Sequence, residues 1–359
     1  MTTTIDPHDA VLEPATDDSG FILDVRELCV AIRGKRVVDG VSLAVRPHEI
    51  LALVGESGCG KSVTSLAVMN LLATGAEVAG GSVTFRGRSV YEFPPSGPEA
   101  LNGNRIAMIF QDPMGSLNPL MQVGPQIAEA LLVHRSAAGR GRGRRELKRW
   151  ARQRALEIMD QVGIPDPARR YRQYPFELSG GMCQRIVIAM AIICHPDLLL
   201  ADEPTTALDV TIQAQILDLL KRLREEVGSA IVLVTHDMGV VAETADRVAV
   251  MYAGRVVETG LVTEVFLSPR HPYTRLLLET MRALENGTPK GRLSTISGAV
   301  PDARHWGEGC RFASRCPKVM ERCHKERPPE TGDDRSSGHR WACWLNDGRG
   351  EMGDIGRGA

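Results

Sequence analysis

One short motif limits what this 359-residue chain can fold into: GESGCGKS at residues 55–62 fits G-x-x-x-x-G-K-[ST]. It follows an apolar strand predicted over 50–54 and precedes a helix predicted to start at Lys61. Its glycines let the backbone wrap around phosphates, and the helix N-terminus adds a favourable dipole. The motif therefore predicts a phosphate-binding loop, with Lys61 on the β and γ oxygens and Ser62 on Mg²⁺. The residues assigned to this loop are Gly55, Glu56, Ser57, Gly58, Cys59, Gly60, Lys61, Ser62 and Val63.

The chain around this motif alternates short β-branched runs with helical patterns. The runs EILALVG, DLLLADEP and AIVLVTHD each precede a helical pattern, and a further strand is expected in RIAMIFQD. Residues 211–227 place apolar side chains three or four positions apart on one stripe. Such alternation predicts an α/β fold around a mostly parallel sheet, interrupted by a more helical insert at about 123–162.

Composition sets the expected domain boundaries. From about Pro269 the chain becomes rich in Pro, Gly, Arg and Cys, and periodic patterning fades. The expected parts are a disordered leader over 1–20, a nucleotide-binding domain over 21–268 with a helical subdomain at about 123–178, a C-terminal extension over 269–344 and a loose tail over 345–359.

Charge and hydropathy exclude several classes of protein. The formal net charge is −1, so no overall field selects nucleic acid or anionic lipid. The first twenty residues lack the pattern of a signal peptide, and the longest apolar runs are about half the roughly 20 residues of a membrane-spanning helix. Residues 135–154 contain nine Lys or Arg and one acid, Glu146. That run suits either a solvated helix face or a nucleic-acid patch, and the solvated face is the favoured interpretation.

Two further motifs complete a nucleotide site. The apolar run LLLADEP ends in Asp202, suited to the Mg²⁺ shell, and Glu203, suited to deprotonating an attacking water; the alternative is a simple helix cap. LSGGMCQR places Ser179, Gly180 and Gly181 at a predicted helix start, which is a second anion site. Because one fold does not need two γ-phosphate sites, this loop is expected to serve the nucleotide of a second subunit.

These motifs, in this order and spacing, resemble the ATP-binding cassette of ABC transporters. They are GESGCGKS, Gln111, LSGGM, LLLADEP, TALD at 206–209 and His236 in VTHD. The stretches FQDPMGSLNPLMQVG, RQYPFELSGGMCQR, DEPTTALDVTIQAQIL, MYAGRVVETG, HPYTRLLL and GCRFASRCP are similar to the ATPase subunits of oligopeptide, dipeptide and nickel importers over about residues 21–344. The resemblance implies a P-loop NTPase fold of the ABC ATPase type. This fold has a RecA-like mixed or parallel sheet core, an antiparallel β region, an α-helical subdomain and a small irregular C-terminal extension with cysteines.

The resemblance also implies roles and partners. Gln111 contacts Mg²⁺ and senses the γ-phosphate while its loop meets the permease, His236 holds the γ-phosphate and the attacking water, and Asp209 contacts the other ATPase. The implied function is an MgATP-hydrolysing motor subunit of an importer for oligopeptides or dipeptides, peripheral on the cytoplasmic face of the cell membrane. The implied partners are two permease subunits, a second ABC ATPase that is a different chain, and, indirectly, an extracytoplasmic binding protein, with no nucleic acid. A nickel importer, a nucleic-acid ATPase and a redox or metal sensor are the alternatives.

Three positions depart from the family pattern. An aromatic residue usually stacks on adenine, whereas CVAIRGKRVV offers only Ile32. Met182 stands where many cassettes have Gln, and in this it is similar to other peptide importers, which also have Met there. Cys183 stands where Arg is usual in this group and is interpreted as a tolerated replacement, with redox sensing as the alternative.

Four of the eight cysteines lie in the last fifty residues: Cys310, Cys316, Cys323 and Cys343. Their spacing fits the zinc template poorly and suits an iron–sulfur cluster at least as well, with a disulfide or unliganded thiols as the other alternative. Similar segments of peptide importers are associated with a four-iron four-sulfur cluster, which the resemblance implies for these four residues. His305, His324 and His339 nearby are expected at the surface, and the segment is expected to contribute no residue to the phosphate, magnesium or water-activating sets.

Overall fold

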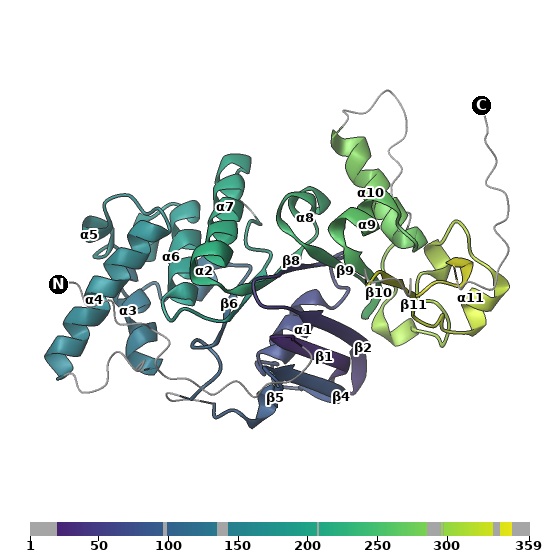
Figure 1. Cartoon of the computed structure of the whole chain (residues 1–359), viewed down its shortest axis with the longest axis horizontal. Coiled ribbons are helices and arrows are strands. Elements are labelled where there is room, and N and C mark those ends of the chain that lie inside the picture. The colour runs from purple at the N-terminus through teal and green to yellow at the C-terminus, as the bar shows by residue number, and fades with distance from the viewer. Residues whose placement is uncertain are drawn as a thin grey trace.

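The computed structural model describes residues 20–95, 99–134, 143–206, 208–285, 296, 298–332 and 338–346. The expected leader and tail lie almost entirely outside these residues, as do positions 135–142 of the basic run. The described residues form two sheets, a helical region and an irregular C-terminal segment (Figure 1).

An eight-stranded sheet forms the centre of the molecule, in the order β11-β12-β10-β9-β3-β8-β7-β6. The strands β6, β7, β8, β3 and β9 run parallel, and β10, β12 and β11 continue the sheet antiparallel. Their bounds are β3 Ile50–Val54, β6 Ile106–Ile109, β7 Leu198–Asp202, β8 Ala230–Thr235, β9 Arg247–Tyr252, β10 Arg255–Leu261, β11 Thr331–Gly332 and β12 Arg340–Trp341. The predicted parallel sheet is confirmed, and the four expected strands lie in it.

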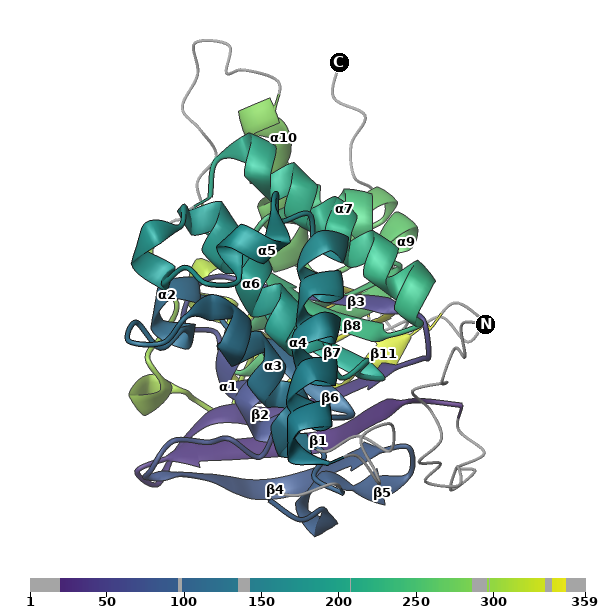
Figure 2. The ribbon, with the colours of Figure 1, turned by 90° about the vertical axis from the view of Figure 1, so that its left-hand side faces the viewer.

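A second sheet is antiparallel, with the order β2-β1-β4-β5. Its strands are β1 Leu23–Ile32, β2 Lys35–Val45, β4 Ala76–Phe85 and β5 Arg88–Ser89. Figure 2 shows it below the central sheet, with helix α1 (Lys61–Val68) close to β1 and β2. Buried side chains of this sheet, such as Leu28 and Val41, share one core cluster with Leu51 and Leu53 of β3.

The named elements between β6 and β7 are all helical. They are α2 Pro113–Ser116, α3 Val123–His134, α4 Arg144–Gln161, α5 Pro167–Arg170, η3 Pro175–Glu177 and α6 Gly180–Ile192. Packing of α3, α4 and α6 against one another buries Ile127, Ile158 and Ile188. In Figure 1 this region lies at the opposite end of the long axis from α11 (Glu321–Lys325).

The remaining helices follow the later strands. They are α7 Val210–Val227, α8 Met238–Thr244, α9 Val262–Leu267 and α10 Pro272–Glu285, with the short 3₁₀ turns η1 Val90–Glu92, η4 Ala303–His305, η5 Ala313–Arg315 and η6 Trp344–Asn346. Helix α7 agrees within one residue with the helix expected over 211–227. No described helix is long and apolar enough to cross a membrane.

The C-terminal segment adds strands to the central sheet. β12 pairs with β10 through Glu258–Trp341 and Thr259–Arg340, and β11 pairs with β12. The eight-stranded sheet therefore continues past the boundary placed near residue 268, which stays a prediction.

Candidate functional site

The phosphate-binding loop leaves the buried strand β3 and enters α1, as its motif predicts. Three of its glycines adopt positive φ angles: Gly55 (154°), Gly58 (78°) and Gly60 (106°). A Cβ atom on Gly55 would lie 2.1 Å from the Met251 carbonyl oxygen at the end of β9. Only glycine permits this close approach of the loop to the neighbouring strand.

Lys61 and Asp202 are buried inside the site. The Lys61 ammonium donates to the Gly55 carbonyl at 2.8 Å and to the Glu56 carbonyl at 3.2 Å. Burial raises the pKa of the Asp202 carboxyl and Glu203 raises it further, whereas Ser62 and Lys61 act in the opposite direction. Asp202 Oδ1 is buried without a hydrogen-bond partner within the described part of the chain. A buried carboxylate oxygen without a partner, next to a serine hydroxyl, fits the oxygen ligands that Mg²⁺ prefers.

Three neighbouring parallel strands bring the expected catalytic side chains to one edge of the sheet. The register pairs Val54 with Thr235, Asp202 with Val234 and Ile109 with Ala201, so the carboxyl ends of β3, β8, β7 and β6 lie side by side. Ligand sites of open α/β sheets form at this edge. Gln111, Glu203 and His236 all follow directly from these strand ends.

Glu203 is the centre of this group. Its Oε2 accepts hydrogen bonds from Gln111 Nε2 at 2.9 Å and Thr206 Oγ1 at 2.9 Å. Its Oε1 lies 3.4 Å from His236 Nδ1. The backbone of Glu203 adopts φ 46°, a left-handed conformation that is uncommon for a glutamate and that often accompanies functional sites. The structure thus brings Gln111, Glu203 and His236 together.

Ser179 and Asp209 cap two helices that pack together. The Ser179 hydroxyl accepts from Met182 N at the start of α6, and Asp209 Oδ1 accepts from Ile212 N at the start of α7. A Cβ atom on Gly181 would lie 2.9 Å from Ile212 Cγ2, so the two helix starts are in contact. Among the described residues, no hydrogen bond or ion pair joins 179–181 to the phosphate-binding loop.

Cys183 is fully buried, and its thiol donates to the Pro175 carbonyl at 3.5 Å. Burial raises the pKa of this thiol, which disfavours the reactive thiolate. A packing role agrees with this environment better than redox sensing does.

The four C-terminal cysteines line one pocket, together with His271, Phe312 and Trp344 among others. Burial raises the pKa of Cys310 to about 11 and of Cys343 to about 12, and the neighbouring cysteines contribute to both shifts. All eight cysteines are free, so the disulfide alternative is wrong. Among the described residues, however, no group of three or more His, Cys, Asp or Glu side chains is arranged to hold a metal ion. The iron–sulfur cluster is not supported by this arrangement and stays a proposal.

One expectation for this segment was wrong. His339 is 3% exposed, and its Nε2 lies 2.9 Å from Glu258 Oε1, because β12 pairs with β10 and turns this ring inward. His305 and His324 are exposed as expected. The segment also contacts the phosphate-binding loop directly, since Arg315 forms an ion pair with Glu56 at 2.9 Å. Sequence reasoning missed Arg315, although it stands in the quoted stretch GCRFASRCP.

Comparison with known proteins agrees with this geometry. A family model described as ABC transporter matches residues 38–206, and one described as oligopeptide/dipeptide transporter, C-terminal region, matches residues 257–323. A putative peptide import ATP-binding protein of Brucella melitensis is 50% identical over 90% of this chain and 97% of its own length. The dipeptide transport ATP-binding protein DppD of Escherichia coli is 48% identical over 82% of this chain and 86% of its own.

A solved structure gives the same fold. An ATP-binding cassette in a dimeric post-hydrolysis state, bound to ADP and Pi, matches with a TM-score of 0.57 and 26% identity, over 67% of this chain and 98% of that one. The predicted fold class is thereby confirmed as the P-loop NTPase fold of an ABC ATPase. The chain belongs to the family of ABC transporter ATP-binding subunits of the oligopeptide/dipeptide type and is an ATPase.

Proposed function

We propose that this chain is the motor subunit of a peptide importer, at the cytoplasmic face of the membrane. The observation that carries the proposal is the match of residues 257–323 to the oligopeptide/dipeptide transporter C-terminal region, beyond the cassette itself. Relatives named for peptide or dipeptide transport are 48–50% identical over most of their own length, which agrees with it.

The proposed chemistry is hydrolysis of ATP at the strand ends. The loop from Gly55 to Val63 binds the phosphates, with Lys61 on the β and γ oxygens. Ser62, Gln111 and Asp202 would hold Mg²⁺, which when bound neutralises the phosphate charge. Glu203 Oε1 accepts a proton from water as the water oxygen bonds to the γ-phosphorus. The bond from the γ-phosphorus to its bridging oxygen breaks, and ADP and phosphate leave. His236 orients the water and the γ-phosphate.

The site is proposed to be complete only in a pair of cassettes. Ser179 caps the start of α6, which Gly180 and Gly181 begin, and this helix N-terminus is proposed to bind the nucleotide of a partner ATPase. Asp209, capping the adjacent α7, then contacts that partner. A dimeric cassette structure among the matches is consistent with this arrangement.

The stretch around Gln111, residues 110–120, is proposed to contact the permease. It presents three exposed apolar side chains: Phe110 is 41% exposed, Met114 47% and Leu120 88%. Exposed apolar side chains grouped on one loop are typical of an interaction site. Two permease subunits and, through them, an extracytoplasmic binding protein are the proposed partners.

A four-iron four-sulfur cluster is proposed for Cys310, Cys316, Cys323 and Cys343. The support is that these four cysteines, of which Cys323 is buried and the others are partly buried, line one pocket and no disulfide joins them. A cluster is wider than a single ion, so its thiolate ligands stand further apart than those of zinc. When bound, the cluster would supply folding energy to a segment with few large apolar residues. Protein purified without oxygen is then expected to be brown, with about four irons and four sulfides per chain. Colourless protein with stoichiometric zinc would contradict the assignment.

Transport is tested in cells that lack this chain. Peptide uptake should return with the wild-type chain and not with Glu203→Gln, and affinity purification from membranes should recover a permease, a partner ATPase and a binding protein. Nickel uptake in place of peptide uptake would favour the nickel alternative. Salt-dependent nucleic-acid binding through the exposed basic face of α4 would favour the nucleic-acid alternative.

A further inference from the structure

Arg315 of the cysteine segment reaches the phosphate-binding loop. Its Nη1 donates to both carboxylate oxygens of Glu56, at 2.9 and 3.2 Å, and to Tyr252 Oη at 3.2 Å. Its Nη2 donates to the Ile296 carbonyl at 3.1 Å. The Arg315 side chain is 5% exposed and Glu56 is 28% exposed. This guanidinium is therefore held by several partners at once, in a position fixed by burial.

Aromatic side chains also contact the phosphate-binding loop at Glu56. The Glu56 backbone N–H donates to Tyr273 Oη at 3.0 Å. The Tyr273 ring packs on Tyr252 and on Phe312, with centroid separations of 4.7 and 5.4 Å. Phe312 belongs to the same stretch as Arg315, between Cys310 and Cys316. The first turn of the loop therefore rests on side chains from beyond residue 268.

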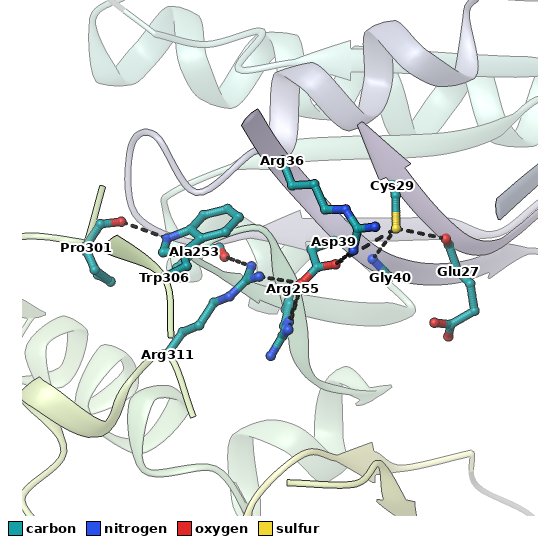
Figure 3. A network of polar contacts seen from close by, with 10 residues as sticks. All are labelled: Glu27, Cys29, Arg36, Asp39, Gly40, Ala253, Arg255, Pro301, Trp306 and Arg311. Atoms are coloured by element: carbon teal, nitrogen blue, oxygen red, sulfur yellow. Dashed lines mark hydrogen bonds and ion pairs between the residues drawn. The ribbon is translucent and has the colours of Figure 1, made fainter. Parts of the chain in front are cut away.

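A second arginine of this stretch supports the other side of the loop. Arg311 donates to the Ala253 carbonyl and pairs with Asp39, and its guanidinium lies over the Trp306 ring (Figure 3). Gly254, next to Ala253, donates from its N–H to the Cys59 carbonyl at 2.8 Å. The stretch from Arg311 to Arg315 thus reaches the loop at Glu56 and, through 253–254, at Cys59.

The negative charge of Glu56 explains how its ion pair with Arg315 can affect nucleotide binding. A carboxylate in a loop that binds phosphates repels the ligand unless a cation neutralises it. Lys61 does not meet this need, because its ammonium is held by the loop carbonyls and is the group expected on the phosphates. We infer that Arg315 is a positioning residue for nucleotide binding, which acts through Glu56 by neutralising its carboxylate and fixing the loop.

A double-mutant cycle on the full-length chain tests this inference. R315M, E56Q and R315M/E56Q are compared with wild type for MgATP affinity, measured by calorimetry. R315M is expected to raise the Kd about tenfold, as loss of charged hydrogen bonds would. Adding E56Q should recover most of that loss, because the neutral amide no longer repels phosphate. R304M is the matched control, since Arg304 is exposed on the same segment and pairs with Asp302; its Kd should equal that of wild type.

Salt and a conservative variant separate this role from a purely structural one. The R315M penalty should shrink as ionic strength rises, because screening weakens the repulsion from an unpaired Glu56. R315K keeps the charge, so its Kd should fall between wild type and R315M, and it serves as the test if R315M does not fold. An unchanged Kd in both variants, or a loss that E56Q does not relieve, would overturn the inference. The cycle requires MgATP binding alone, so its result is independent of whether peptides are the transported substrate.

Discussion

Removal of the Asp39 carboxylate is expected to detach the cysteine segment from the antiparallel sheet. Asp39 Oδ2 accepts from Arg255 Nε at 3.1 Å and Nη2 at 2.7 Å, and it also pairs with Arg311 (Figure 3). The Asp39 and Arg311 side chains are 10% and 7% exposed. Asp39→Ala therefore leaves two largely buried guanidinium groups without the carboxylate that neutralises them, although Arg311 still donates to the Ala253 carbonyl.

The expected loss of stability in Asp39→Ala follows from the burial of this ion pair. Breaking a buried ion pair by removing one partner costs about 3–5 kcal/mol. Arg36, the third cation on Asp39, is 62% exposed and adds little. We expect Asp39→Ala to lower the free energy of unfolding by about 3 kcal/mol. Glu330→Ala, which removes an exposed partner of Arg340 in the same segment, should cost less than about 1 kcal/mol.

Urea denaturation and hydrogen exchange measure the two parts of this prediction. Peptides covering 300–316 should lose protection in Asp39→Ala, because Arg311 no longer anchors them to the sheet, whereas Glu330→Ala should leave them unchanged. Equal protection in the two variants, or equal losses of stability, would refute the reasoning.

The pH dependence gives an independent check. Burial alone would raise the pKa of Asp39, but the hydrogen bond from Arg255 and the charges of Arg255 and Arg311 outweigh it and hold the pKa below its ordinary 3.8. A carboxyl with a depressed folded-state pKa stabilises fully above its unfolded value and loses that contribution as pH falls through the folded value. The stability difference between wild type and Asp39→Asn should thus be constant above about pH 5 and shrink below pH 3.8.

Three further substitutions address the nucleotide site. Gly55→Ala should abolish MgATP binding, because its Cβ would lie 2.1 Å from the Met251 carbonyl, whereas Gly58→Ala meets no atom within 4 Å and should reduce affinity less; calorimetry compares the two. Glu203→Gln should abolish phosphate release yet keep MgATP binding, because the carboxylate acts on water and not on the phosphates, so near-normal turnover would remove Glu203 from the mechanism. Ile32→Tyr should tighten MgATP binding by about 1 kcal/mol at most if adenine stacks there, and an unaltered Kd would place the base elsewhere.

Local sequence predicted the positions of the candidate catalytic residues at the strand ends, because each motif closely follows its own strand. A parallel register then brings Gln111, Glu203 and His236 to one edge without further information. Glu203 contacts Gln111 because β6 and β7 are neighbouring strands, and it contacts Thr206 because both residues lie in the turn after β7. The order of strands in the sheet was not predicted, because hydrophobic patterning does not say which strands are neighbours.

The long-range contacts could not be predicted in the same way. Asp39 and Arg311 are 272 positions apart, and Glu56 and Arg315 are 259 apart. Nothing in the local pattern of either stretch indicates its partner, because ion pairs have no periodicity. His339 was expected at the surface for the same reason: the two-residue strand β12 is too short to show an alternation, and only its pairing with β10 buries the ring against Glu258.

One short stretch, residues 310–316, lines the cysteine pocket and also contacts the phosphate-binding loop through Arg315. Arg311 and Arg315 both lie between Cys310 and Cys316, and Phe312 between them lines the pocket and packs on Tyr252 and Tyr273. Anything that orders the pocket, a bound cluster included, therefore also fixes the two guanidinium groups that support the loop. Linkage makes this reciprocal: if ordering the segment favours MgATP binding, bound MgATP must stabilise the segment by the same free energy. On this inference, a segment that the sequence placed outside the nucleotide site would be coupled to the first turn of the phosphate-binding loop through the Arg315–Glu56 ion pair.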